Sequence, residues 1–338
     1  MTDLEILNSI KEKDYFTNSF LLERDIFDDN QACLFDNQST DEFFYFFKKT
    51  KYDFKNMFFY ANKTAVLANK SIFLKEPYFV TELITLDNKK EQTFYINNWL
   101  YSQENFHYRT NLRMYRYNNL PVDELDFSLV QNPDQNDLEE IIFHLELNFD
   151  KYSERIPSIE ELKKWQNSTY IIKEDNQIAA ILISEMKGTT NELHFWLVIS
   201  KFRGKGYGDL VFKYCLNCNK EIQRYTSWIN INHQYSIKKH IECGFLKDRI
   251  TNKIYLNINI MKEEIIKILE ETRPEFDFSE ENIDFISAGY LDSFDIITLV
   301  VDLETKFDVK IIGALILPEN FSSVAAILKL IETSKNAS

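Results

Sequence analysis

Hydrophobic and polar residues follow three different patterns along the 338 residues of this chain. Residues 1–122 contain no glycine and many aromatic residues, and short runs within them alternate between apolar and polar side chains. Such alternation predicts strands, and one stretch between the last two runs has helical spacing. The strands are expected at 56–68, 77–86 and 108–117, and the helix at 91–103. The proline-containing segment 118–126 indicates a domain boundary.

A second region begins at Phe127, where predicted helices and strands follow one another as in an α/β domain. Residues 136–147 have helical spacing, and Ser158 is a typical first residue of a further helix. Strands are expected at 169–174, 177–186, 192–200 and 226–232, helices at 208–218 and 235–243, and a final pair of strands divided near 248–252.

The third region, from about Met261, has helical spacing throughout and a different charge. It carries 16 Asp and Glu against 7 Lys and Arg, a net charge of −9 out of −14 for the whole chain. This asymmetry indicates a separate acidic module. We therefore expect an α/β region at 1–122, an α/β domain at 123–259 and a small helical bundle at 260–338.

The overall composition excludes several classes of partner. A net charge of −14 argues against nucleic acid, because phosphate backbones require clustered Lys and Arg. No apolar run approaches the roughly 18 residues of a membrane span, and the first residues lack the pattern of a signal peptide. Four scattered cysteines do not make a disulfide framework. We expect a cytoplasmic protein with neither a nucleic-acid nor a membrane partner.

Glycine is rare in this chain, but three of its 7 glycines fall in the stretch FRGKGYGDL, residues 202–210. This stretch lies between a predicted strand and a predicted helix. A glycine-rich turn there lets backbone N–H groups converge, and the helix amino terminus adds positive charge, so the geometry suits a phosphate. The alternative is a tight turn without a ligand.

Arg203-x-x-Gly206-x-Gly208, with Gly244-Phe245 ending a later helix, resembles the GNAT family of acyl-CoA N-acyltransferases over roughly Phe127 to Asn259. The resemblance implies a mixed-sheet α/β fold whose pantetheine groove lies where strands 192–200 and 226–232 splay apart. It also implies that the N–H near Val198 donates to the thioester carbonyl. The expected residues of the coenzyme A diphosphate loop are Arg203, Gly204, Lys205, Gly206, Tyr207 and Gly208.

Acyl transfer to an amine requires a base for the amine and an acid for the leaving thiolate. Glu192 stands where some members of this family carry their base, and His194, two residues on, is expected on the same side of the strand. His194 is the alternative base. The family's usual acid is a tyrosine, whose position is occupied here by His240, and His233 is a further candidate acid.

Two cysteine-containing pairs have spacings that permit zinc, Cys215-x-x-Cys218 and His240-x-x-Cys243. Both pairs lie on predicted helices, where residues three apart are also ordinary packing positions. We therefore predict no metal.

The acidic tail contains Gly289-Tyr-Leu-Asp-Ser293-Phe before an apolar helical run. A serine there is a natural helix cap, and a phosphodiester on its hydroxyl would lie at the positive end of the helix. Size, acidity and motif resemble an acyl carrier protein, which implies 4′-phosphopantetheine attached covalently to Ser293. The first and last helices are expected at 262–271 and 324–333, after a short linker from Asn259 to Lys262.

The leading hypothesis is an N-acyltransferase that takes an acyl group from its own carrier, or from acetyl-CoA or another acyl-CoA, and acylates an amine. Residues 1–122 are interpreted as a degenerate GNAT-like half without the phosphate loop. One alternative is a loading acyltransferase that moves the acyl group from coenzyme A to the carrier thiol. Another is a carrier scaffold with an inactive transferase domain. The implied partners are a phosphopantetheinyl transferase, an acyl-activating or acyl-loading enzyme and a small-molecule amine.

Overall fold

The chain forms two compact units in a computed structural model that describes residues 15–18, 43–70, 76–87, 90–119, 125–280 and 283–336. The second unit is Thr110–Asn252, and the first unit joins Met1–Arg109 to Lys253–Ser338. This division groups residues differently from the three expected domains. The expected boundary near residue 122 lies outside the described residues, so the three-domain division stays a prediction.

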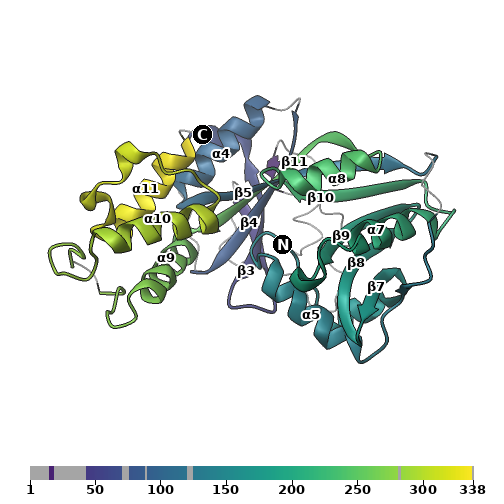
Figure 1. The fold of residues 1–338 in the computed structure, drawn as a ribbon. Helices are drawn as coiled ribbons and strands as arrows, with labels where there is room; N and C mark the ends of the chain where they lie inside the picture. The colour runs from purple at the N-terminus through teal and green to yellow at the C-terminus, as the bar shows by residue number, and fades with distance from the viewer. Residues whose placement is uncertain are drawn as a thin grey trace. The chain divides into compact units, whose positions relative to one another are not determined.

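The second unit is a mixed sheet in the order β5-β10-β9-β8-β7-β6, with helices packed on its strands (Figure 1). Its strands from β6 to β9 pair antiparallel, β9 pairs parallel with β10, and β10 pairs antiparallel with β5. The strands are β5 (Asn105–Tyr117), β6 (Val130–Gln131), β7 (Thr169–Glu174), β8 (Gln177–Lys187), β9 (Thr190–Val198) and β10 (Arg224–Asn230). The helical segments are α5 (Asp137–Asn148), α6 (Ile159–Lys164), η2 (Gln166–Ser168), η3 (Ser200–Phe202), α7 (Tyr207–Asn217) and α8 (Gln234–Glu242).

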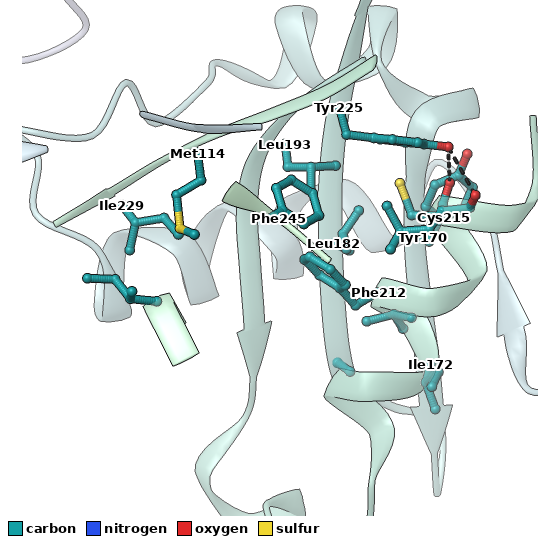
Figure 2. Packing of buried hydrophobic residues seen from close by; sticks show 14 of the residues in the cluster. Met114, Tyr170, Ile172, Leu182, Leu193, Phe212, Cys215, Tyr225, Ile229 and Phe245 are labelled. Carbon is teal, nitrogen blue, oxygen red and sulfur yellow. Dashed lines mark hydrogen bonds between the residues drawn. The ribbon is translucent and has the colours of Figure 1, made fainter. Parts of the chain in front are cut away.

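Each face of this sheet packs against its own helices. On one face, apolar side chains of β5, β8, β9 and β10 pack with α7 and α8, as Figure 2 shows for Leu182, Leu193, Phe212 and Phe245. On the other face, α5 and α6 cover β7, β8 and β9 around Ile181. The sequence builds this second layer locally, because Ser158 and Glu161 form the reciprocal capping box that starts α6.

The first unit contains β1 (Tyr15–Thr17), β2 (Phe43–Lys49), β3 (Lys55–Asn62) and β4 (Phe79–Leu86). It also contains the helices α3 (Lys63–Leu67) and α4 (Lys90–Ser102). Strand β3 pairs antiparallel with β1 and β2 and parallel with β4. Aromatic side chains fill this core, including Phe43, Phe59 and Trp99, whose rings lie 5.4–5.9 Å apart.

The carboxy-terminal part of the first unit is helical. It consists of α9 (Ile258–Thr272), α10 (Ser293–Phe307), η4 (Gly313–Leu315), η5 (Pro318–Phe321) and α11 (Val324–Asn336). Helix α9 packs against both α10 and α11, and Leu299, Leu303 and Phe307 are almost completely buried. Near its end, Lys335 extends its buried ammonium to the carbonyls of His107 and Tyr108, which attaches α11 to the start of β5.

The structure confirms the expected mixed α/β sheet with helices and corrects several local predictions. The final pair of strands is one strand, β11 (Leu246–Asn257), which passes from the second unit into the first. The expected strand 56–68 ends at Asn62, whose side chain caps α3. The expected linker at Asn259–Lys262 is part of α9, because Asn257 ends β11 and at the same time caps that helix.

Candidate functional site

Strands β9 and β10 separate after Leu193, and the family resemblance implied such a separation. Their parallel pairing runs from Thr190 opposite Arg224 to Leu193 opposite Ser227, whereas β9 continues to Val198. The register of β9 with β8 shifts at the same point, which leaves His194 as the extra residue of a β-bulge. The N–H of Ile199 donates to Ala179 on the β8 side. Because successive N–H groups of a strand point in opposite directions, the N–H of Val198 points to the edge from which β10 has diverged.

The glycine stretch follows directly and opens helix α7. Gly204 and Gly206 have φ angles of +85° and +81°, which L-residues with side chains rarely adopt. Gly208 is required for a different reason, since a Cβ there would lie 2.9 Å from Cγ2 of Val198. The Trp196 indole donates to the Gly208 carbonyl at 3.0 Å and so fixes the first turn of α7 on β9.

No side chain caps the amino terminus of α7. The N–H groups of the first turn have no partner within a helix, and together with the helix dipole they form a natural anion site. Gly206, the N-cap residue, has no side chain that could occupy it. The diphosphate loop stays a prediction, and the uncapped amino terminus of α7 has the geometry that it needs.

The side chains of the loop divide into two groups. Glu174 accepts hydrogen bonds from Lys205 at 2.5 Å and from the Tyr207 hydroxyl at 2.7 Å, and these bonds lower the pKa of Glu174. Lys205 and Tyr207 are thus tied to the end of β7. Among the described residues, the exposed side chain of Arg203 donates a hydrogen bond only to the Val198 carbonyl, at 3.4 Å. Its guanidinium is therefore the loop cation best placed to meet an anion.

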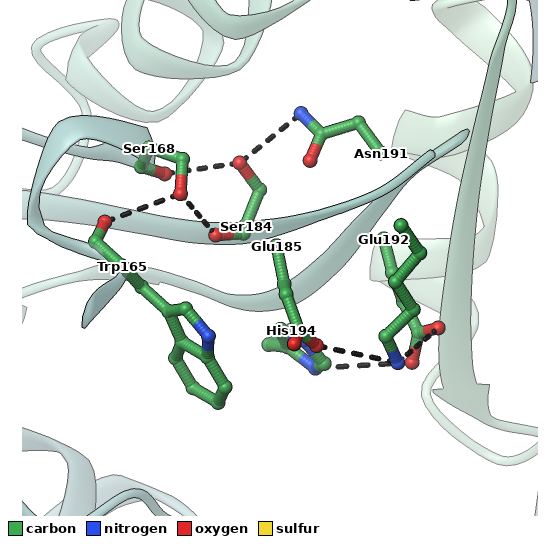
Figure 3. Close-up of polar contacts among 8 residues, drawn as sticks. Trp165, Ser168, Ser184, Glu185, Asn191, Glu192 and His194 are labelled. Atoms are coloured by element: carbon green, nitrogen blue, oxygen red, sulfur yellow. Dashed lines mark hydrogen bonds and ion pairs between the residues drawn. The ribbon is translucent and has the colours of Figure 1, made fainter. Parts of the chain in front are cut away.

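Three charged side chains and the imidazole of His194 gather on the α6 side of β8 and β9 (Figure 3). Glu185 and Glu192 are directly opposed in the register, and the Lys187 ammonium lies 3.2 and 3.0 Å from them. His194 Nε2 lies 3.1 Å from Glu185 Oε2, while Nδ1 lies 3.9 Å from Glu192. The bond from His194 and the nearby Lys187 lower the pKa of Glu185 to about 2.

Glu192 and His194 therefore come together as the sequence predicted, but Glu185, Lys187 and Trp165 were missed. The Trp165 ring stacks on the His194 ring at 4.9 Å and 14°. The two carboxylates could have been found from the turn, since a two-residue loop between Lys187 and Thr190 places residue 185 opposite residue 192. Trp165 lies at the end of α6, far from His194 in the sequence, and no sequence pattern indicates that the two rings stack.

His240 lies elsewhere, inside the core of the second unit. It is 3% exposed and its ring meets those of Trp196, Phe212 and Phe245 edge-on. Burial lowers the pKa of His240 to about 4, and Nδ1 is bonded to the Ser236 carbonyl at 2.8 Å. A neutral imidazole among aromatic rings is a packing residue, so we do not place it in the reacting centre. His233, by contrast, is exposed and precedes α8.

Cys215 and Cys218 lie near the end of α7, where Cys218 Sγ contacts the Cys215 carbonyl and the Tyr170 hydroxyl. Cys215 is buried in the core shown in Figure 2, where the Tyr225 hydroxyl donates to its carbonyl, and burial raises the pKa of the Cys215 thiol. Cys243 follows α8, and its carbonyl accepts from the buried Arg116. Among the described residues, no group of three or more His, Cys, Asp and Glu side chains could hold a metal ion. Cys33 lies outside these residues.

Ser293 is the first residue of α10, and Asp292, rather than Ser293, is its cap. Asp292 accepts from the N–H groups of Phe294 and Asp295, while Asp295 reaches back to the N–H of Asp292. Within the described residues, the exposed Ser293 hydroxyl makes no hydrogen bond. Phe294 beside it is 81% exposed. The hydroxyl is therefore free of the structural role that the sequence pattern also allowed.

Comparison with known proteins gives structural likeness only. No family model and no curated protein matches the chain. It is similar to solved structures, among them a GCN5-related N-acetyltransferase from Sphaerobacter thermophilus (7% identity, 64% of this chain and 76% of that one, TM-score 0.46). Another is a GNAT-family acetyltransferase from Colwellia psychrerythraea (11% identity, 63% and 84%, TM-score 0.42).

Over the ranges that the structure describes, none of the helices has both the length and the apolar character that crossing a membrane needs.

Proposed function

We propose that this protein is an N-acyltransferase that moves an acyl group from a pantetheine thioester to an amine. This proposal depends on three features that lie together at the end of β9, from Leu193 to Val198. The strand loses its parallel partner after Leu193, His194 bulges out at that point, and the open amino terminus of α7 follows Val198 through the glycine loop. A diphosphate at the loop and a thioester along the free edge of β9 fit this arrangement.

The residues of the chain suit the proton transfers of such a reaction. Glu185 accepts from Nε2–H of His194, a tautomer that leaves Nδ1 as the proton acceptor. As the amine nitrogen bonds to the acyl carbon and the carbon–sulfur bond breaks, Nδ1 takes the amine proton and then returns it to the departing thiolate. Glu192, 3.9 Å from Nδ1, stabilises the positive imidazolium, and the N–H of Val198 polarises the acyl carbonyl.

We further propose that Ser293 carries 4′-phosphopantetheine and that α9 to α11 act as an acyl carrier. The support is the exposed, unbonded hydroxyl at the positive end of a 15-residue helix, with Gly289 at φ +74° in the turn before it. Because α9 begins at the residue after β11, no flexible linker connects this bundle to the strand. The carrier and coenzyme A present the same pantetheine arm, so the free edge of β9 could accept either donor.

Intact mass spectrometry tests both proposals. Chain co-expressed with a phosphopantetheinyl transferase should gain one phosphopantetheine group, which Ser293→Ala abolishes and Ser287→Ala, a nearby exposed serine, retains. Incubation with acetyl-CoA and an amine should then yield N-acetylated amine. Stable acetylation of the protein on the Ser293 arm without any amine product would support the loading alternative, and the absence of both products would support an inactive scaffold.

A further inference from the structure

A cluster of cationic and aromatic side chains lies on the same sheet face as Glu192. In β5 and β10, Met114 and Tyr225 point into the core with α7 and α8, so their neighbours Arg113, Tyr115 and Arg224 lie on the opposite face. Thr226 stands opposite both Glu192 and Tyr115 in the register. Since adjacent strands are about 4.8 Å apart, the backbone of Tyr115 lies about 10 Å from that of Glu192.

Two guanidiniums in this cluster share one carboxylate. Arg113 contacts Asp248 Oδ2 through Nε and Nη2, both at 2.8 Å, and Arg224 Nη2 contacts the same oxygen at 3.2 Å. The other oxygen, Oδ1, accepts the N–H of Arg249 at 2.7 Å. Asp248 is thereby fully used, and the three side chains keep a net charge of +1.

The guanidiniums are held in place but not covered. Arg224 lies over the Tyr115 ring at 4.9 Å, and Arg113 over the Trp228 ring at 5.8 Å. The side chains of Arg113 and Arg224 remain 26% and 31% exposed. Within the described chain, Nε of Arg224 is buried without a hydrogen-bond partner. Stacked, partly exposed guanidiniums with unused donors are suited to bind a planar anion through two parallel hydrogen bonds.

Resting on the proposed function, we propose that Arg113 and Arg224 bind the carboxylate of the acyl acceptor, which is therefore an amino acid whose amine reaches His194. One excess positive charge matches one carboxylate. It disfavours polyamines, because a second ammonium would meet the guanidiniums. An amino sugar without a carboxylate would bring no negative charge to the pair. The separation from Glu192 calls for an amine several bonds away from the carboxylate.

Calorimetry on the full chain tests this with 6-aminohexanoate and its primary amide, which differ only in the charged group. The wild type should bind the carboxylate at least ten-fold more tightly than the amide. Arg224→Gln and Arg113→Gln should each remove most of that preference, and Arg224→Lys should retain part of it. Arg249→Gln, which removes an equal charge from an exposed neighbouring position of β11, should leave it unchanged.

Equal binding of the two ligands by the wild type would overturn the proposal, as would an equal loss in Arg249→Gln and Arg224→Gln. Thermal unfolding of each variant separates loss of binding from loss of fold. Acetyl transfer to both ligands without any preference would refute the carboxylate site and leave the acyltransferase intact. A preserved carboxylate preference in a protein that neither binds coenzyme A nor transfers acetyl would refute the acyltransferase and leave the carboxylate site.

Discussion

Two segments of this chain have the same order of elements. In each, two parallel strands pair over a short stretch and then separate, and the segments differ in what lies in the gap between them. The segments are β3-α3-β4-α4-β5 and β9-α7-β10-α8-β11. In each, the parallel pair is joined over a few residues only, Lys55–Met57 with β4 and Thr190–Leu193 with β10. Each first strand then runs on, to Asn62 and to Val198. The topology alone therefore creates a gap twice.

In the first segment, the gap is filled by the chain itself. Strand β2 covers one edge of β3, so β1, which pairs with Tyr60–Asn62, lies on the edge that β4 has left. The next residue, Asn18, is fully buried. Its side-chain Nδ2 donates to the Met57 carbonyl, and its Oδ1 accepts from the N–H of Phe59. Its backbone carbonyl accepts from the N–H of Ile84 on β4. In the second segment, no strand of the described residues pairs with β9 on that edge beyond Leu193.

The helices that follow β3 and β9 also differ, in whether a side chain caps their first turn. Helix α3 has only five residues, and Asn62 caps it by accepting the N–H of Thr64 at 2.8 Å. Helix α7 has 11 residues, begins at a glycine with positive φ and has no side-chain cap. Asn62 thus caps the first of these helices, while no side chain caps the second. The interpretation of residues 1–122 as a half without a phosphate loop stays a prediction.

The largest expected effect comes from closing the second gap at its loop. Gly206→Asp places a side chain at φ +81° and a negative charge at the amino terminus of α7, which opposes an anion. We expect coenzyme A affinity to fall on the order of 100-fold or more, measured by calorimetry. Gly206→Asn, without the charge, should lose less. Lys63→Asp, the matched change at the start of α3, should have no effect, and an equal loss there would remove the distinction between the segments.

The second prediction concerns the reacting group at the end of the parallel pairing. His194→Asn removes the proposed proton acceptor, and kcat for acetyl transfer should fall roughly 100- to 1000-fold with little change in the KM for acetyl-CoA. Glu185→Gln should lower kcat about ten-fold, because it loses only the orientation and charge support of the imidazole. Glu139→Gln, an exposed carboxylate on α5, is the control. A rise in KM without a fall in kcat would show that His194 binds substrate instead.

The third prediction concerns Asn18, whose side chain fills the gap between β3 and β4. Asn18→Ala leaves the Met57 carbonyl and the Phe59 N–H buried without partners, and each such group costs about 1–3 kcal/mol. We expect the free energy of unfolding to fall by about 2–4 kcal/mol in urea denaturation, with coenzyme A affinity unchanged. Asn98→Ala, an exposed asparagine of α4, should have little effect. If the variant instead bound coenzyme A more tightly, the first gap would itself be a ligand site.

Some features of the two segments could be predicted from the sequence, and others could not. Most of the strands and helices, the capping serine at Ser158 and the shared side of Glu192 and His194 follow from local patterns and were predicted. The diverging strands were expected from the family resemblance. The filling of the first gap was not, because Asn18 follows a three-residue strand and its partner Phe59 is 41 residues away. The polar residues from Asp248 suggested a turn, but Asp248 is polar because it binds Arg113 and Arg224 across the sheet.

The smallest expected effect is a pH dependence of the free energy of unfolding. It comes from α8 and has no counterpart in α4, the helix at the same place in the first segment. Each contributes a buried ring, Trp99 in α4 and His240 in α8, but only the latter titrates. The folded pKa of His240, about 4, is below the ordinary 6.5, so its stabilising contribution is present above pH 6.5 and is lost as the pH falls towards 4. This loss should amount to about 2 kcal/mol at pH 5 relative to pH 7.

His240→Phe should remove that pH dependence, because a phenyl ring fits among the same aromatic neighbours and carries no proton. Urea denaturation of wild type and variant at pH 7 and pH 5 measures the difference directly. His107, whose pKa burial lowers to about 3, contributes with the same sign in both proteins and cancels from the comparison. Equal pH dependence in the two proteins would mean that His240 is solvated in the folded state, and its exclusion from the reacting centre would then have to be withdrawn.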